Sequence, residues 1–479
     1  MSGKKTASPA LNRRGFLKMG ALSSLALGSG VGLSSAGSAA QRSVNALGRA
    51  RNVIVLVSDG MSSGALAMAD QYCKWRDGAH SQWIQEYARQ RGSRGLMEMA
   101  SANSIVTDSA AASSSWGCGQ RVLNGRVNMD ADGKPIEPVL SIARRSGKST
   151  GLVTTATVTH ATPAGFAANM MSRNDEAAIA LQYLERDYQV VLGGGNRFFS
   201  AENRDDRKDL YAAFAEQGHA VVRTSGELDR VSSDQDKILG IFSDAHLPYE
   251  VNRLHDADLK ARVPSLAEMT ARALTSLNRN ANGFVLQVEA ARVDHAAHRN
   301  DTAGLLFDQL AFDDAIKVAL EFYESNPDTL VIITTDHGNA NPGLSSSGGG
   351  DGGAGTFGIL SKCQGTYDRL GLEAGMDRRQ IKQAFDRVMQ LEISNRDADL
   401  LKARLEEYLE VPYGRMAGLY AVIGQVMANH TDIGWVGNAH TSDLVELYAT
   451  GPGSEQVKPF NRNTDLFTIM LDSLGLARA

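Results

Sequence analysis

The sequence predicts an α/β fold, a three-layer α/β/α sandwich with a mostly parallel central sheet and a helical insertion. Three observations predict it. Short runs of β-branched and apolar residues are continuous rather than alternating, helical patterns lie between them, and the runs end in polar or glycine-rich turns. Continuous apolar runs are typical of strands covered on both faces, and strands that alternate with helices form parallel sheets.

The first forty residues have the pattern of an export signal. Paired arginines stand in NRRGFLKMG at 12–20, and a weakly apolar run, interrupted by glycine and serine, continues to the small residues at 38–40. This pattern predicts a twin-arginine signal peptide over 1–40, a periplasmic or secreted protein, and the twin-arginine export machinery as a partner. The run is too dilute for a stable membrane anchor.

Composition excludes some classes of partner and of fold. The chain of 479 residues has a net charge of −5, which becomes −10 when the five cations of the signal are removed. Without an excess of lysine and arginine, no nucleic-acid partner is expected. Only three cysteines are present, so at most one disulfide can form and disulfides do not hold the fold together.

Five runs are predicted as strands of the sheet. They span 52–60, 149–156, 188–195, 283–290 and 330–338. Amphipathic patterns predict helices over 177–187 and 305–324.

The C-terminal part of the chain interrupts this alternation. Residues 344–356 are too rich in glycine to pack, which predicts a flexible loop. Residues 376–410 are charged and amphipathic at helical spacing. We therefore predict one catalytic domain over 41–479 that carries a glycine-rich loop and a helical insertion at about 344–415.

Several predicted strands end in side chains of the types that can bind metal ions. Asp59 closes the first strand, Glu289 the fourth, and Asp336 with His337 the fifth. An acid before glycine is often only a turn former. Ligands bind at the carboxyl ends of the strands in such a sheet, so several ends with metal-binding groups indicate a shared site.

A second group of such side chains follows the fourth strand. Asp294 and His298 are four residues apart, which places a carboxylate and an imidazole on one face of a helical turn, and His440 stands in NAHTSDLVELY. The alternative for the first pair alone is a solvated surface helix.

These side chains divide into three ligand sets. Asp294, His298 and His440 suit a zinc site with an open position. Asp59, Asp336 and His337 suit a second zinc, with Ser109 at its open position. Thr162, Glu289 and the other oxygen of Asp59 offer the hard oxygen ligands that Mg²⁺ prefers.

Ser109 has two interpretations. It lies in VTDSAAASSSWGCG at 106–119, directly after an acid and before small, helix-compatible residues. A serine at this position usually caps a helix, but a hydroxyl beside a metal ion is also activated as a nucleophile.

The set of motifs resembles the alkaline phosphatase family. In family order, the chain contains SDGM at 58–61, VTDSAA at 106–111, HATPA at 160–164, SR at 172–173, LGGGNRFF at 192–199, DHAAH at 294–298 after Glu289, TTDHG at 334–338 and AHTSD at 439–443. The resemblance extends from about residue 52 to the C-terminus. Any one motif alone is weak, whereas the combination is very specific.

The resemblance implies a role for each of these residues. Ser109 would attack phosphorus and become phosphoserine, and Arg173 would bind two phosphate oxygens. The three ligand sets would hold two Zn²⁺ ions and one Mg²⁺ ion. The substrates would be small-molecule phosphate monoesters, and a homodimer is one assembly to expect.

Two histidines depart from the pattern of some family members. His160 stands where some members have an acid, and His295 where some have lysine. We expect both to lie just outside the ligand sets, where a structural role is an equal alternative. The other histidines, His246 among them, are expected to be ordinary residues.

Two other functions remain open from the sequence. A phosphodiesterase would use the same metal core, and a non-catalytic metal- or phosphate-binding protein of the cell envelope would keep some of these ligands. A sulfatase would need a Cys/Ser-x-Pro-x-Arg segment, which residues 109–113 lack.

Overall fold

A computed structural model describes residues 49–345 and 353–477. Its centre is a ten-stranded sheet in the order β14-β2-β13-β8-β1-β7-β3-β4-β6-β5. Every adjacent pair is parallel except the two that involve β13. The strands are β1 (Asn52–Ser58), β2 (Ser93–Glu98), β3 (Ser149–Thr157), β4 (Val190–Gly194), β5 (Ala220–Val222), β6 (Ile238–Ile241), β7 (Phe284–Ala290), β8 (Thr329–Thr334), β13 (Val445–Thr450) and β14 (Phe460–Arg462).

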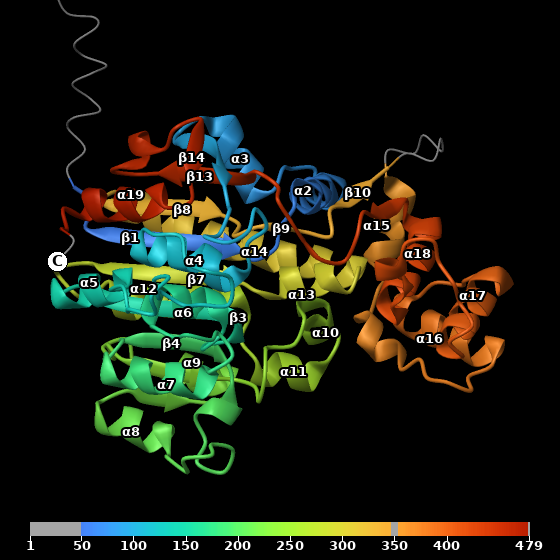
Figure 1. Cartoon of the computed structure of the whole chain (residues 1–479), viewed down its shortest axis with the longest axis horizontal. Helices are drawn as coiled ribbons and strands as arrows, with labels where there is room; N and C mark the ends of the chain where they lie inside the picture. Colours follow the sequence, from blue (N-terminus) through green and yellow to red (C-terminus); the bar gives the residue numbers. More distant parts are fainter. Residues whose placement is uncertain (1–48, 346–352, 478–479) are drawn as a thin grey trace, which may run out of the picture. The chain divides into compact units, whose positions relative to one another are not determined.

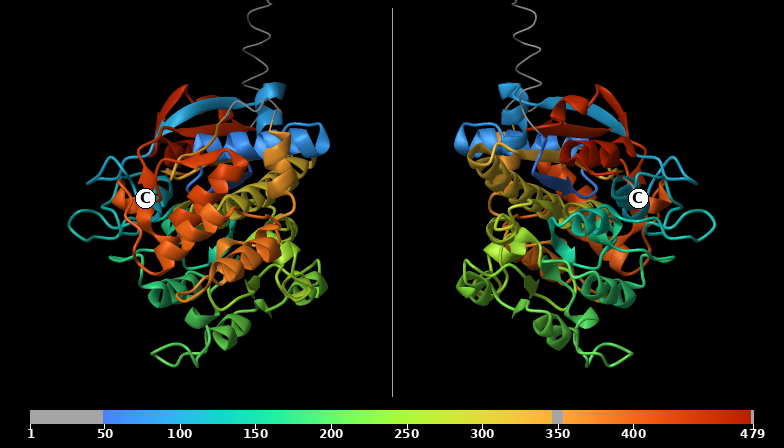
Figure 2. Two further views of the ribbon diagram at one scale, coloured as in Figure 1. Left: turned by 90° about the vertical axis from the view of Figure 1, so that its right-hand side faces the viewer. Right: turned by 90° about the vertical axis from the view of Figure 1, so that its left-hand side faces the viewer.

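Helices cover both faces of this sheet (Figure 1 and Figure 2). The first layer contains α2 (Ser63–Asp77), α3 (Gln82–Arg89), α9 (Ser225–Arg230), α10 (Glu250–Leu254), α12 (Leu266–Leu277), α13 (Arg292–His298) and α14 (Thr302–Ser325). The second contains α4 (Ser109–Cys118), α5 (Val139–Arg145), α6 (Ala161–Ala167), α7 (Glu176–Glu185), α8 (Leu210–Glu216) and α19 (Asp465–Leu474). A short helix, α11 (Ala257–Arg262), follows α10.

The alternation of side chains along β1 explains why it is apolar throughout. Ile54 and Leu56 belong to the core under the first layer, whereas Val53, Val55 and Val57 belong to the core under the second. Because successive side chains of a strand point to opposite faces, a strand between two helical layers needs apolar residues at every position. The predicted α/β/α sandwich with a mostly parallel sheet is confirmed.

The five predicted strands correspond to β1, β3, β4, β7 and β8. The sequence interpretation did not identify β2, β5, β6, β13 and β14. β5 and β14 have three residues each and β6 has four, and β2 is only partly buried. Such strands lack the long apolar run that marks a central strand.

The C-terminal helices form a separate group beside the sheet, orange to red in Figure 1. They are α15 (Ala354–Leu360), α16 (Arg378–Met389), α17 (Asn395–Leu405) and α18 (Leu419–Thr431), and α17 packs on both α16 and α18. β10 (Pro342–Leu344) and β11 (Ile433–Trp435) pair at the base of this group. The helical region thus continues beyond the residues about 344–415 assigned to the insertion.

The glycine-rich segment is shorter than the predicted loop over 344–356. Leu344 ends β10 and α15 begins at Ala354, so both ends of the segment belong to regular elements. Of the residues between them, 346–352 lie outside the described residues.

Two further predictions concern the N-terminus and the cysteines. The signal peptide over 1–40 lies outside the described residues. Within the ranges that the structure describes, no helix is both long enough and apolar enough to cross a membrane. Cys73, Cys118 and Cys363 are all buried and form no disulfide.

Candidate active site

The register of the parallel strands brings the predicted ligands to one edge of the sheet. Val57 of β1 pairs with Glu289 of β7 and with Thr334 of β8. The residues that follow these positions therefore leave the sheet at the same level, and this is where Asp59 and Asp336 lie. Their side chains, like that of Glu289, are fully buried.

Gly60 allows the backbone after β1 to approach Asp294. Its φ of +66° lies in the left-handed region, and a Cβ built there would lie 2.5 Å from Asp294 Oδ1. Only glycine accepts both conditions. The SDGM turn thus brings the end of β1 against α13.

Ser109 lies at the start of α4 but does not cap it. The N-cap is Asp108, whose side chain accepts a hydrogen bond from the backbone N–H of Ala111 at 2.9 Å. Ser109 is the first helical residue, so the expected capping role is wrong, because the preceding carboxylate fulfils it. The serine hydroxyl is therefore free for another partner, and its Oγ lies 3.2 Å from His337 Nε2.

Asp59, Asp336 and His337 form the first group of candidate ligands, with ligand atoms within 4.8 Å of one another. His337 Nε2 lies 3.2 Å from Asp336 Oδ2 and 3.6 Å from Asp59 Oδ1. Asp336 Oδ1 accepts a hydrogen bond from the backbone N–H of Gly60 at 2.9 Å, which fixes the orientation of that carboxylate.

Asp294, His298 and His440 form the second group. His298 Nδ1 lies 2.9 Å from the backbone oxygen of Asn438, and His440 Nδ1 lies 3.0 Å from that of Thr107. A carbonyl oxygen only accepts, so both Nδ1 atoms carry the hydrogen and both Nε2 atoms present lone pairs.

These Nε2 atoms lie 3.1 Å apart, and the Asp294 oxygens lie 3.4 Å and 3.5 Å from them. Two facing lone pairs and a carboxylate repel one another unless a cation lies between them. The donor set of two imidazoles and one carboxylate therefore fits a zinc ion.

A short β-ladder brings the two groups together. β12 (His440–Thr441) pairs antiparallel with β9 (Gly338–Asn339), directly after His337. The rings of His337 and His440 stack with their centroids 3.6 Å apart. Asn339 donates a hydrogen bond to Asp294 Oδ1 at 2.7 Å and so orients the second carboxylate.

A third group lies on the other side of Asp59. Thr162 Oγ1 lies 3.4 Å from Asp59 Oδ2, and Glu289 Oε2 accepts a hydrogen bond from Thr154. The ligand atoms of Asp59, Glu289 and His160 also lie within 4.8 Å of one another. His160, expected just outside the ligand sets, thus lies within reach of this group, because it precedes α6, which carries Thr162.

Several polar atoms of this centre are buried and have no hydrogen-bond partner. They are Asp59 Oδ1, Glu289 Oε1, Asp336 Oδ2, His337 Nδ1 and His160 Nδ1. Leaving such atoms unpaired in the protein interior is costly. An acceptor-rich, unsatisfied set of this kind fits bound cations.

The pKa values show how strongly the carboxylates interact. Burial and the neighbouring Asp336 raise the pKa of Asp59 well above its usual range. Burial raises the pKa of Glu289 to about 7. Burial also acts to raise the pKa of Asp336, but the His337 imidazole outweighs it and lowers that pKa to about 2.

Arg173 forms an ion pair with Asp108, the residue that precedes Ser109. Its Nη1 donates to Asp108 Oδ2 at 3.1 Å, and its Nη2 donates to His160 Nε2 at 3.2 Å. The guanidinium is partly exposed, so it remains accessible to an anion next to the serine. A planar guanidinium can bind two oxygens of a phosphoryl group at once.

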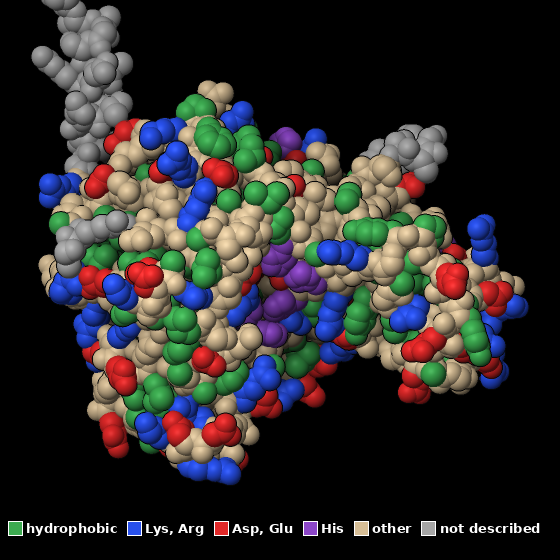
Figure 3. Space-filling view, in the orientation of Figure 1, with side chains coloured by type: hydrophobic (Ala, Val, Ile, Leu, Met, Phe, Trp, Pro, Cys, Tyr) green, Lys and Arg blue, Asp and Glu red, His purple; other side chains and the backbone are tan. Residues whose placement is uncertain are grey.

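The sequence interpretation missed His246. It was expected to be an ordinary residue, but its ring lies against His295, with centroids 4.5 Å apart, and against His160 at 5.5 Å. Histidine side chains gather in the hollow at the centre of Figure 3. No local spacing could have found this histidine, because the loop after β6 brings it to the site.

Comparisons with known proteins agree with this geometry. The family model described as alkaline phosphatase matches residues 50–476. The chain belongs to the alkaline phosphatase family. The fold and the family resemblance predicted from the motifs are therefore confirmed, and the enzyme is a phosphoric monoester hydrolase.

Individual relatives cover most of the chain. Alkaline phosphatase 4 of Bacillus subtilis is 30% identical over 430 residues, 88% of each chain. The crystal structure of Thermus thermophilus alkaline phosphatase has a TM-score of 0.83 and 37% identity, and covers 90% of this chain and 92% of that one. Streptomycin-6-phosphate phosphatase of Streptomyces griseus is 32% identical over 334 residues, 61% of this chain and 74% of the relative.

Proposed function

We propose that this alkaline phosphatase hydrolyses phosphate monoesters through a phosphoserine on Ser109, with two Zn²⁺ ions and one Mg²⁺ ion at the carboxyl edge of the sheet. The observation that carries the proposal is the position of Ser109 Oγ, 3.2 Å from His337 Nε2, beside two further buried candidate ligands of the same group. A serine hydroxyl is a weak nucleophile until a neighbouring group or ion promotes loss of its proton.

The reaction proceeds in two displacements. Ser109 Oγ forms a bond to phosphorus, the bond from phosphorus to the ester oxygen breaks, and the alcohol leaves with a proton. Water then attacks the phosphoserine, so that phosphate leaves and the serine hydroxyl is restored. The N-terminus of α4, where Ser109 lies, favours the negative charge of the phosphoryl group throughout.

Arg173 would hold the phosphoryl group for attack. Its ion pair with Asp108 keeps the guanidinium next to the nucleophile while part of it stays accessible. Binding two phosphoryl oxygens there fixes the orientation of phosphorus toward Ser109.

The three ligand groups would hold the ions. Asp59, Asp336 and His337 would bind one zinc, and Asp294, His298 and His440 the other. Asp59, Thr162 and Glu289 would bind magnesium, with His160 close enough to change the preference for the third ion. The ions would supply Lewis-acid stabilisation of the negative charge that develops on the attacking and leaving oxygens.

The test combines metal analysis with two substrates. Purified protein is assayed for metal content and for turnover of p-nitrophenyl phosphate and bis(p-nitrophenyl) phosphate. We expect two zinc ions per chain and faster turnover of the monoester. Faster turnover of the diester would instead support a phosphodiesterase, and full activity after dialysis against a chelator would refute the metal assignment.

Export and assembly are further parts of the proposal. The paired arginines at 13–14 support twin-arginine export to the periplasm or medium, and a homodimer is the proposed assembly. Replacing both arginines with lysine should keep the precursor inside the cell, and detection of the mature enzyme outside would contradict this route.

A further inference from the structure

Two histidines beside the centre have their ring hydrogens fixed by their partners. The backbone N–H of Thr157 donates to His246 Nδ1 at 3.1 Å. Arg292 Nη1 lies 2.9 Å from His295 Nδ1, and arginine has only donors. Both Nδ1 atoms therefore accept, and the hydrogen of each neutral ring must be on Nε2.

The two Nε2–H groups are left without a partner in the described part of the chain. The hydrogen bonds of both rings involve Nδ1 alone, and neither Nε2 is among the fully enclosed unpaired atoms. The rings lie 4.5 Å apart between centroids. Both side chains are partly exposed, so the two neighbouring rings can offer their Nε2–H groups to one ligand, and histidine side chains are visible on the face shown in Figure 3.

This pair lies next to the phosphoryl site but is distinct from it. The rings of His246 and His295 contact that of His160 at 5.5 Å and 5.6 Å between centroids. His160 in turn accepts a hydrogen bond from Arg173. An ester bound at Ser109 and Arg173 would therefore lie beside the His160 ring, which both rings of the pair contact.

Positive charge surrounds the pair. The guanidinium of Arg292 stacks on the Tyr249 ring, with its Cζ 3.6 Å from the ring centroid, and its buried Nε has no hydrogen-bond partner. Arg197 is a second cationic neighbour of His246. Neutral N–H donors with cations behind them favour an anionic oxygen ligand over a cation or an apolar group.

We propose that the Nε2–H groups of His246 and His295 form a second subsite, which binds an anionic oxygen group on the leaving-group part of the substrate. The inference rests on the proposed function and narrows it to phosphate monoesters that carry a carboxylate or a second phosphoryl group. Arg292 is a positioning residue in this arrangement, because it acts through the tautomer of His295.

Three matched substrates test the subsite with the metal-loaded enzyme. Glycerol 3-phosphate, 3-phosphoglycerate and glycerol 1,3-bisphosphate share a three-carbon backbone and differ in a hydroxyl, a carboxylate or a phosphoryl group at the far end. Because two charge-assisted hydrogen bonds are gained, we expect a KM at least about fivefold lower for one or both anionic substrates. A lower KM for 3-phosphoglycerate would identify the bound group as a carboxylate, and a lower KM for glycerol 1,3-bisphosphate would identify it as a phosphoryl group.

His246→Ala should remove that preference. The KM for the anionic substrate should rise about fivefold or more relative to the KM for glycerol 3-phosphate measured with the same variant, because binding of the second anionic group is lost. His246→Gln keeps one acceptor for the Thr157 N–H and one donor, so it should retain most of the preference. It also serves as the second variant if the alanine protein does not fold.

Different results overturn different parts of the argument. Equal KM values for all three substrates in the wild-type enzyme, or an equal loss on all three in His246→Ala, would refute the subsite and leave the proposed function intact. Absence of phosphate release from all three would refute the proposed function and the subsite together.

Discussion

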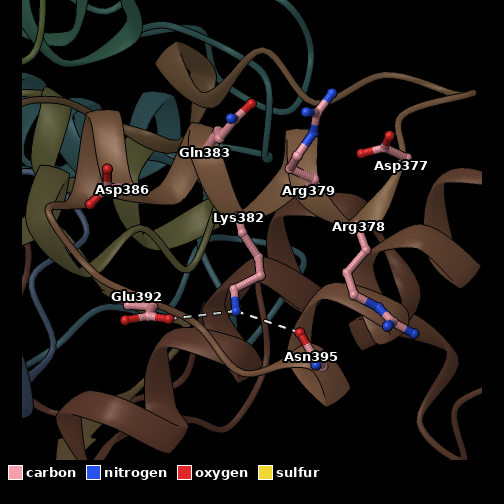
Figure 4. Close-up of a pocket in the computed structure, with 8 residues that line it drawn as sticks. All are labelled: Asp377, Arg378, Arg379, Lys382, Gln383, Asp386, Glu392 and Asn395. Atoms are coloured by element: carbon pink, nitrogen blue, oxygen red, sulfur yellow. Dashed lines mark hydrogen bonds and ion pairs between the residues drawn. The ribbon is translucent and has the colours of Figure 1, made fainter.

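The charged side chains at the carboxyl edge of the sheet are buried, whereas those of the cleft in the helical region are exposed to solvent. At the sheet edge, Asp59, Glu289 and Asp336 are fully buried, and each has an oxygen without a hydrogen-bond partner. The cleft at α16 and the start of α17 has a volume of about 710 Å³, which is large enough for a small ligand. Its lining is almost wholly exposed (Figure 4).

Two of the cations that line the cleft form ion pairs. Lys382 lies 3.7 Å from Glu392 and 3.5 Å from Asn395, as the dashed lines of Figure 4 show. Arg378 pairs with Asp399 at 2.8 Å, and both side chains are half exposed. Exposed pairs of this kind are satisfied by each other and by water. The comparison teaches that a ligand site is marked by buried polar atoms without partners rather than by the size of a cavity.

The largest effect should follow from the loss of the nucleophile. Ser109→Ala removes the hydroxyl that attacks phosphorus, so kcat should fall by about four orders of magnitude, and radiolabelled substrate should leave no phosphoenzyme on the quenched protein. Ser115→Ala is the matched control, because Ser115 is a buried serine of the same helix whose hydroxyl donates to the backbone oxygen of Ala112. Labelling that persists in Ser109→Ala would contradict the assignment.

Removal of the ions should make stability depend on pH. In the metal-free protein, burial raises the pKa of Glu289 from 4.5 to about 7, and the pKa of Asp59 is raised as well. The folded protein then binds these protons more tightly than the unfolded chain, so the contribution of these groups to stability is fully present below about pH 4.5 and is lost as pH rises toward 7. The loss for Glu289 is on the order of 3 kcal/mol, which is a few degrees in Tm.

Thermal unfolding at pH 5 and pH 8 measures this dependence. Protein dialysed against a chelator should show a lower Tm at pH 8 than at pH 5, whereas the metal-loaded protein should lose little, because a bound cation favours the ionised carboxylates. Parallel pH profiles with and without metal would mean that these carboxylates do not hold ions.

A smaller effect is expected at the phosphate-binding arginine. Arg173→Lys keeps the charge but loses the planar pair of donors, so kcat/KM for p-nitrophenyl phosphate should fall about tenfold or more. Arg186→Lys is a suitable control, because that arginine binds the backbone of Ala167 and the side chain of Asn169 instead. Equal effects of the two substitutions on kcat/KM would argue against a specific role of Arg173.

The smallest effect should come from the cleft. Arg378→Gln breaks the exposed ion pair with Asp399, so the free energy of unfolding should change by no more than about 0.5 kcal/mol, with kcat/KM unchanged. Urea unfolding and the standard assay measure both quantities. A severalfold change in activity would show that the helical region contributes to the site and would end the contrast between the two regions.

Some of the site could be predicted from the sequence because several of its ligand residues lie close together in the chain. Asp294 and His298 lie one helical turn apart, and Asp336 and His337 are adjacent at the end of a strand, so spacing alone grouped them. The central strands were also recognisable, because burial on both faces requires an unbroken apolar run. The short and peripheral strands carry no such requirement and were missed.

The sequence by itself determined the class of fold, the family and the types of side chain available for chemistry. Only the tertiary structure decided that Asp108 caps α4 in place of Ser109, that His160 reaches the third group, and that His246 faces His295. These contacts join residues from different loops, and their geometry depends on strand register and on which ring nitrogen each neighbour occupies. Neither quantity is expressed in the order of residues along one segment, because both arise from packing between segments far apart in the chain.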